Sequence, residues 1–230
     1  MAPDATYTLA DQERMSRAVR YFAWQSRLVT PHLGRRVVEV GCGIGNFTGA
    51  LLERELVVAI DVEAACVGRL QERFPGRPNL HALVCDDIAG LARFAPDSVV
   101  CLNVLEHIED DAAAVRQMAS ILTPGGVIVL MVPAFPALYG PIDRNLGHYR
   151  RYTRRSMAEL AGRCGLQVRA ARYMNTVGFF GWWWNARVAR RESQSAGQIA
   201  LFDRVVVPVM SRVEDALRPP FGQSLLVVLG

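Results

Sequence analysis

The chain holds 230 residues, of which 51% are hydrophobic and 21% charged, a composition typical of a globular protein with one substantial core. Its net charge of +4 is uneven, because residues 1–143 carry 12 arginines against 17 acids and residues 144–230 carry 14 arginines against 5 acids. No stretch approaches the roughly 18 uninterrupted apolar residues of a membrane-spanning helix, and the first twenty residues hold no apolar signal region. An integral membrane protein is therefore not expected.

The five cysteines lie far apart, and none forms the Cys-x-x-Cys pair of a zinc or redox site. We therefore predict no metal site and a cytoplasmic location. All basic Lys/Arg side chains of the sequence are arginines, and the chain has no lysine. Two interpretations of this bias stay open, a GC-rich genome and the bidentate binding of carboxylate or phosphate groups.

The predicted elements alternate between short Val/Ile/Leu runs and longer amphipathic stretches, as in a parallel sheet joined by crossover helices. An amphipathic helix from Asp11 to Val29 ends before Pro31 and resembles a lid. Strands are then expected near residues 36–41, 56–61, 80–85, 98–103 and 126–132, with helices near 46–54, 63–74 and 110–121.

The second half of the chain departs from this alternation. Prolines and glycines predict a long loop over residues 133–152, and a loop of that length is usually functional. A helix capped by Thr153 is expected to reach about Cys164, with Gly165 as its stop. Strands near 167–173 and 224–229 would complete the sheet, with a helical insertion over residues 178–218 between them.

The segment Val37–Asn46 places three glycines where the first strand must turn sharply. Glycine permits that turn and lets a ligand approach the backbone. The motif lacks the third glycine of a dinucleotide fingerprint, since Asn46 stands there. Asp61 ends the second strand and is placed to accept hydrogen bonds from both hydroxyls of a ribose. Asp86 and Asp87 follow the third strand and offer further acceptors at the same edge.

Together these segments resemble the class I S-adenosylmethionine-dependent methyltransferases, particularly the small-molecule branch that includes the ubiquinone-biosynthesis (type 11) enzymes. The resemblance rests on Val37–Asn46, Asp61, Asp86, the fourth-strand segment Cys101–Ile108 and the turn Leu122–Gly126, and it covers roughly residues 20–170. It implies an α/β, Rossmann-like fold. The sheet would have seven mostly parallel strands, the last antiparallel, with helices on both faces.

The resemblance also implies S-adenosylmethionine as the cofactor and assigns residues to it. Glu39 would lie near the methionine amino group, Asp61 on the ribose, Asp86 and Ile88 around the adenine, and Asn103 with Leu105 beneath the sulfonium. The other expected cofactor contacts are Gly41, Cys42, Gly43, Gly45, Asn46, Val62, Asp87 and Tyr21. One domain over residues 1–230 would then comprise a cap helix (1–33), a cofactor-binding core (34–133) and an acceptor side (134–230).

The loop beyond the fifth strand supplies the candidates for acceptor chemistry. His148 has a pKa range suited to a general base, and His107 is the second candidate, with Tyr149 beside them. Asp143 belongs to the same acceptor-side segment. Arg150 and Arg151 are expected to bind a carboxylate or phosphate of the acceptor. For each residue, a purely structural role is the alternative.

The run Phe179–Trp184 contains five aromatic residues and cannot lie on one helix face. Trp183 and its neighbours either pack in the core, form an apolar wall for the acceptor, or contact a membrane surface together with Arg187, Arg190 and Arg191.

These features predict transfer of a methyl group to an oxygen or carbon atom of a small, apolar acceptor that carries an anionic group, a carboxylate or a phosphate. Methylation of a lipid or isoprenoid at a membrane surface is an alternative, and a nicotinamide-dependent reductase is disfavoured because the chain has no lysine for a Tyr-x-x-x-Lys pair. A nucleic-acid partner is not expected, since Asn103-Val104-Leu105-Glu106 differs from the Asn-Pro-Pro-Tyr motif that grips a flipped base. The protein is expected to be a monomer or homodimer.

Overall fold

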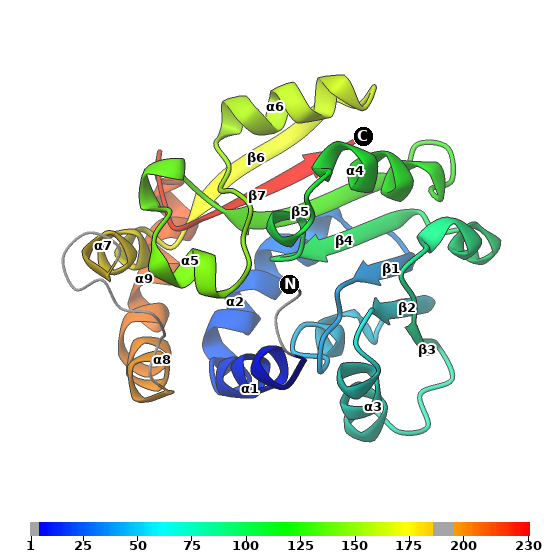
Figure 1. Cartoon of the computed structure of the whole chain (residues 1–230), viewed down its shortest axis with the longest axis horizontal. Coiled ribbons are helices and arrows are strands. Elements are labelled where there is room, and N and C mark those ends of the chain that lie inside the picture. The colour runs from blue at the N-terminus through cyan, green and yellow to red at the C-terminus, as the bar shows by residue number, and fades with distance from the viewer. Residues whose placement is uncertain (1–4, 186–195) are drawn as a thin grey trace.

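The computed structural model describes residues 5–185 and 196–230, and a seven-stranded sheet forms its centre (Figure 1). The strands lie in the order β3-β2-β1-β4-β5-β7-β6. Because β7 is antiparallel to both β5 and β6, the other six strands share one direction. The predicted Rossmann-like sheet with an antiparallel last strand is confirmed. The strands are β1 (Arg36–Val40), β2 (Leu56–Asp61), β3 (Leu80–Val84), β4 (Ser98–Leu102), β5 (Val127–Pro133), β6 (Val168–Met174) and β7 (Ser224–Leu229).

Helices cover both faces of the sheet (Figure 1). Alternate residues of the central strands point to opposite faces, so Val38 packs with α4 and α6, whereas Val37 packs with α2 and α9. Burial on both faces accounts for the continuous apolar runs of β1, β4 and β5. The helices are α1 (Ala5–Met15), α2 (Val19–Val29), α3 (Ala64–Arg73), α4 (Asp111–Ser120), α5 (Pro141–Asn145), α6 (Arg154–Arg163), α7 (Thr176–Trp184), α8 (Ala196–Leu201) and α9 (Val207–Leu217).

The predicted N-terminal helix over residues 11–29 is two helices, α1 and α2, rather than one. Ala18 leaves the helical region of backbone conformation and separates them. The backbone N–H groups of Arg20 and Tyr21 then donate to the carboxylate of Asp203 at 3.2 and 2.8 Å. A carboxylate at a helix N-terminus stabilises unpaired N–H groups there. The break depends on a residue far along the chain, so local periodicity did not reveal it.

Two further predicted elements differ from the structure. The expected helix over residues 46–54 is only a 3-10 turn at Thr48–Leu51, because Gly49 disfavours a longer helix and the side chains of Phe47 and Leu51 are both drawn into the core. The expected loop over residues 133–152 contains a 3-10 turn at Pro136–Leu138 and the short helix α5.

The insertion predicted over residues 178–218 is helical wherever it is described. It comprises α7, α8, a π-helical turn at Phe202–Val206 and α9. Val207 and Met210 of α9 pack on the sheet face that α2 also covers. Arg187, Arg190 and Arg191 lie outside the described residues.

Candidate active site

The glycine loop after β1 has the conformation that its sequence predicts. Gly41, Gly43 and Gly45 have φ angles of +74°, +52° and +80°, a region that other residues rarely adopt. A Cβ atom on Gly41 would lie 2.2 Å from Cγ2 of Val104. The loop therefore needs glycine for both backbone conformation and close packing, and it lies at the carboxyl edge of the sheet with Cys42–Gly45 buried.

Asp61 connects this loop to the end of β2. Its Oδ2 accepts a hydrogen bond from the N–H of Gly43 at 2.8 Å, and its Oδ1 accepts one from the N–H of Glu63 at 3.0 Å. An ionised carboxylate has about four acceptor positions, so two backbone bonds leave capacity for the hydroxyls of a ribose. These bonds fix the direction of the carboxylate.

Glu39 belongs to β1, directly before the glycine loop, and is buried. Its Oε2 accepts a hydrogen bond from the hydroxyl of Thr48 at 2.6 Å. Burial raises the pKa of Glu39 to about 8, and the hydrogen bond from Thr48 only partly offsets it. A buried carboxyl group that is readily ionised by a nearby cation suits the predicted contact with an amino group.

The adenine-side residues divide between exposed and buried positions. Asp86 is exposed, whereas Ile88 is buried in the core. Val62, which was expected only as a further cofactor contact, is exposed as well. Asp87 caps the 3-10 turn Ile88–Phe94 by accepting the N–H of Ala89 at 3.0 Å. Of the two neighbouring acids, Asp86 is thus the one whose carboxylate has no capping role.

Gln12 of α1 contacts the glycine loop, a contact that the sequence did not suggest. Its Oε1 accepts the N–H of Ile44 at 2.8 Å, and its backbone carbonyl accepts the side-chain N–H of Asn46 at 3.0 Å. Cys42 of the loop is buried against Leu70 of α3. The N-terminal segment therefore covers the loop through Gln12.

Asn103, Leu105 and Tyr21 occupy three different environments. Asn103 follows β4 with a φ of +55°, and its N–H donates to the carbonyl of Met131 at 2.7 Å. Leu105 is fully buried in the core. Burial raises the pKa of Tyr21, whose hydroxyl lies beside Ser224 and Asn175 on the β7 and β6 side of the sheet, and its contact with the cofactor stays a prediction. Two strands, β4 and β5, separate that position from the strand that carries the glycine loop.

His148 and Asp143 form a buried pair beyond β5. The Nδ1 of His148 lies 2.9 Å from Oδ1 of Asp143, and neither side chain is more than 8% exposed. Burial alone would raise the pKa of Asp143, but hydrogen bonds from His148 and the guanidinium of Arg151 outweigh it and lower that pKa. Because an ionised Asp143 can only accept, Nδ1 of His148 carries the hydrogen, and Nε2 is left as the basic nitrogen.

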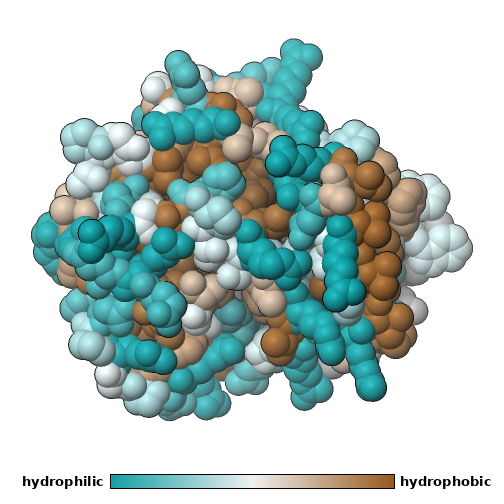
Figure 2. Space-filling model, turned by 180° about the vertical axis from the view of Figure 1, so that it is seen from behind, coloured by the Kyte–Doolittle hydropathy of each residue, from teal (hydrophilic) through white to brown (hydrophobic). Residues whose placement is uncertain are grey.

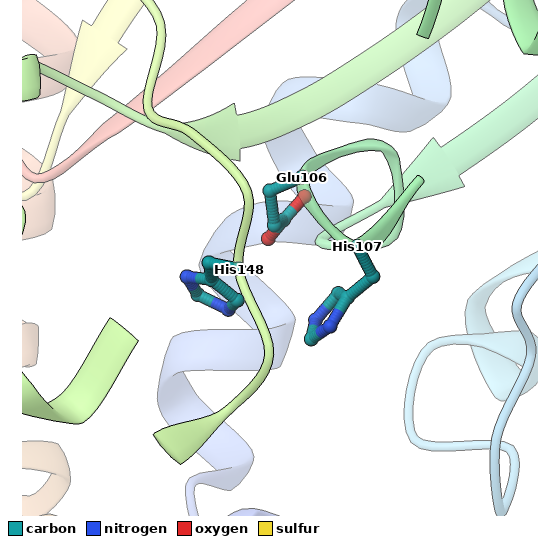
Figure 3. Close-up of side chains that lie close together, drawn as sticks. All are labelled: Glu106, His107 and His148. Atoms are coloured by element: carbon teal, nitrogen blue, oxygen red, sulfur yellow. The ribbon is translucent and has the colours of Figure 1, made fainter. Parts of the chain in front are cut away.

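Glu106 and His107 come from the turn after β4 and face His148 across a small gap (Figure 3). The two imidazole rings are perpendicular, with centroids 4.6 Å apart. Burial raises the pKa of Glu106 to about 8, and its Oε2 is buried without a hydrogen-bond partner. One ligand atom from each of the three residues lies within 4.8 Å of the others. These residues could therefore also hold a divalent cation, which the sequence did not predict.

The two arginines expected to bind the acceptor are engaged by the protein itself. Arg151 is buried, and its Nε donates to Asp143 at 2.8 Å while its Nη1 donates to the carbonyl of Ala134 at 3.2 Å. Arg150 donates to the carbonyls of Ile108 and Glu109 and forms an ion pair with Asp111. The predicted binding of an acceptor anion by Arg151 is thus disfavoured, because the buried charge of Asp143 already engages its guanidinium.

The aromatic run divides between two sides of α7, as its length requires. Trp182 is buried with Leu138 and Ile142, and its indole N–H points to Oδ2 of Asp143 at 3.4 Å. The guanidinium of Arg151 lies 4.8 Å from the centre of a Trp182 ring. Trp183 is instead half-exposed. Tyr149 is exposed too, and its N–H donates to the carbonyl of Glu106.

Comparisons with known proteins agree with this architecture. A family model described as a methyltransferase domain matches residues 9–171. An uncharacterized methyltransferase of Mycobacterium bovis is 35% identical over 105 residues, which are 44% of this chain and 52% of that protein. The ubiquinone biosynthesis O-methyltransferase of Xanthomonas axonopodis pv. citri is 35% identical over 101 residues, which are 42% of each protein.

A solved structure gives the same result for the fold. The S-adenosylmethionine-dependent methyltransferase from Mesorhizobium loti is similar with a TM-score of 0.58 and 17% identity, over 89% of this chain and 95% of that one. The chain belongs to the methyltransferase-domain family, and its fold is that of the class I S-adenosylmethionine-dependent methyltransferases. It spans about half the length of the curated relatives described above.

Proposed function

We propose that this protein transfers the methyl group of S-adenosylmethionine to an oxygen or carbon atom of a small apolar acceptor. Membership of the family and the glycine loop support the cofactor, together with the carboxyl groups of Glu39 in β1 and Asp61 at the end of β2. S-adenosylmethionine supplies an electrophilic methyl group when it is bound. The contribution of the protein is then to position the acceptor and remove its proton, and positioning alone supplies up to roughly 7–11 kcal/mol.

The pair of His148 and Asp143 carries the proposal for proton removal. Nε2 of His148 would accept the proton of the acceptor hydroxyl as the oxygen–methyl bond forms. Asp143 keeps the ring in the required tautomer and stabilises the imidazolium that results. A positioned base of this kind contributes about 10² to 10⁴-fold in rate.

An apolar wall beside this pair supports an apolar acceptor. Phe135 stacks on Tyr173 with ring centroids 4.9 Å apart and meets the edge of Phe179 at 5.5 Å. Phe135 and Phe179 also pack against the cluster formed by Leu138, Ile142 and Trp182. Arg150 is the remaining candidate for an anionic group of the acceptor, because its side chain stays 29% exposed while it bonds the two carbonyls.

The test is methyl transfer from labelled S-adenosylmethionine into a cell extract, with the product identified by mass spectrometry. We expect His148→Gln to lower the turnover of that product about 10² to 10⁴-fold while affinity for S-adenosylhomocysteine is unchanged. The matched control is His32→Gln, at an exposed histidine near the start of β1. Turnover of His148→Gln within threefold of wild type would reject the base, and the absence of any labelled product would reject methyl transfer itself.

A further inference from the structure

The helical segment from α8 to α9 carries an apolar face that points outward. Its large apolar side chains recur at every fourth residue, and each is between 49 and 75% exposed. Figure 2 shows a hydrophobic column at the right edge of the molecule, bordered by long hydrophilic side chains, where these helices lie in the reversed view. We call this face the outer stripe, and it consists of Leu201, Val205, Val209, Val213 and Leu217.

The outer stripe does not serve the core, because the opposite face of the same segment already does. Val207 and Met210 are buried against the sheet and Trp24. Asp203 accepts the N–H groups at the start of α2, which fixes the segment to the rest of the domain. The segment is therefore apolar on two sides, and a helix of that kind is normally covered on both. Scattered apolar residues are common on surfaces, but a contiguous row of them marks an interaction site.

The charges around the outer stripe have one sign. Arg204, Arg212 and Arg218 are exposed, and each is adjacent in sequence to a residue of the stripe. Two of the three acids of the segment face inward instead. Asp203 and Glu214 are buried, and Glu214 accepts three hydrogen bonds from Asn175 and Thr176.

The remaining acid of the segment, Asp215, is already paired. It accepts hydrogen bonds from Trp24, Arg27 and Arg172. Apart from the paired Asp215, the exposed charged side chains among the described residues of α8 to α9 are thus positive.

The neighbouring helix α7 also carries exposed aromatic residues. Its first residue, Thr176, contacts α9 through the bonds to Glu214. Phe180, Trp183 and Trp184 are exposed on it. Tryptophan is enriched where a protein meets the interface between lipid and water, because its ring is apolar and its N–H polar.

We propose that the outer stripe, its three arginines and the exposed aromatics of α7 together dock onto the face of an anionic lipid bilayer. Apolar side chains would enter the boundary between head groups and acyl chains, while the arginines meet the anionic head groups. None of the helices in residues 5–185 and 196–230 has the length and hydrophobicity of a membrane span. The proposed contact is with the surface of the bilayer. A symmetric pairing with a second copy would instead set the same positive patches against each other.

The proposal is independent of the methyl acceptor, and its test is vesicle flotation. The probes are vesicles of phosphatidylcholine alone and of phosphatidylcholine with 30% phosphatidylglycerol. We expect the wild-type protein to float with the anionic vesicles and to partition at least tenfold less onto the neutral ones. The substitution Arg212→Gln should weaken partitioning onto anionic vesicles roughly fivefold.

The decisive variant is Val209→Glu with Val213→Glu, which places acids in the outer stripe without touching the core. We expect at least a tenfold loss of partitioning, with unchanged thermal unfolding and unchanged binding of S-adenosylhomocysteine. The matched control is Val84→Glu, at an exposed valine on the edge strand β3. The proposal is overturned if the wild type floats with neither vesicle or if the double variant floats as well as wild type. It is also overturned if light scattering shows a dimer that the double variant abolishes.

Discussion

Replacement of Asp143 by Asn tests how strongly the buried polar cluster depends on one negative charge. The carboxylate of Asp143 is fully buried, and it accepts Nε of Arg151 at 2.8 Å, Nδ1 of His148 at 2.9 Å and the N–H of Gly140 at 2.9 Å. The side chain of Arg151 is itself only 1% exposed. Loss of the negative charge leaves the guanidinium buried without a counter-charge, which costs about 3–5 kcal/mol.

At about 2–4 °C per kcal/mol for a chain of this size, Asp143→Asn should lower the melting temperature by roughly 6–20 °C. Differential scanning calorimetry at pH 7 measures this shift. The double variant Asp143→Asn with Arg151→Met should recover much of the lost stability, because removal of both charges of a buried pair often leaves the free energy of unfolding unchanged. The matched control is Asp110→Asn, an exposed cap of α4 where Asn serves equally well.

The pH dependence of the same variant has a defined sign. The pKa of Asp143 is lowered in the folded protein, so its ionised form stabilises the fold above the unfolded-state pKa of about 3.9. This contribution is lost as the pH falls below that value, and the difference between wild type and Asp143→Asn should shrink there. An unfolding free energy of the variant within 1 kcal/mol of wild type at pH 7 would refute the reasoning, as would an absence of recovery with Arg151→Met.

Three further predictions concern the cofactor, the acceptor and a cation. Because the pKa of Glu39 is about 8 without ligand, binding of the S-adenosylhomocysteine ammonium at pH 7 should release up to about one proton. The heat of binding measured by titration calorimetry should therefore differ between phosphate and Tris buffer for wild type and be the same for Glu39→Gln. Equal heats in the two buffers for wild type would contradict this prediction. Arg150→Met should raise the acceptor KM several-fold without changing affinity for S-adenosylhomocysteine, and a loss of cofactor binding would remove Arg150 from the acceptor site. Since the base proposed is a histidine aligned by a carboxylate, turnover should survive treatment with EDTA; a loss that Zn²⁺ or Mn²⁺ restores would instead assign Glu106, His107 and His148 to a cation.

The sheet and the glycine loop could be predicted because their signals are local. The apolar run of β1 and the glycines at Gly41, Gly43 and Gly45 report a strand and a turn that only glycine can make. The wrong helix over residues 46–54 shows the limit of periodicity, since a few residues with apolar spacing also fit a single 3-10 turn.

For the acceptor side, the sequence suggested candidate residues but not the contacts that those residues make. His148 and Asp143 are five residues apart, yet their pairing depends on α5, which the prolines and glycines of that segment did not suggest. Arg151 was predicted to bind an anionic group of the acceptor, whereas its side chain is buried against Asp143. Its burial follows from Asp143 and Trp182, and Trp182 lies on a helix that begins after β6.

Isothermal titration of S-adenosylhomocysteine into wild type and Asp61→Ala tests the central claim most directly. The predicted contacts to the ribose are hydrogen bonds to a charged group, each contributing about 1.5–3 kcal/mol, so Asp61→Ala should bind at least tenfold more weakly than wild type. Glu72→Ala, at an exposed carboxylate on α3, should bind as wild type does. Failure of the wild-type protein to bind S-adenosylhomocysteine, or equal affinity in the Asp61→Ala protein, would contradict the account.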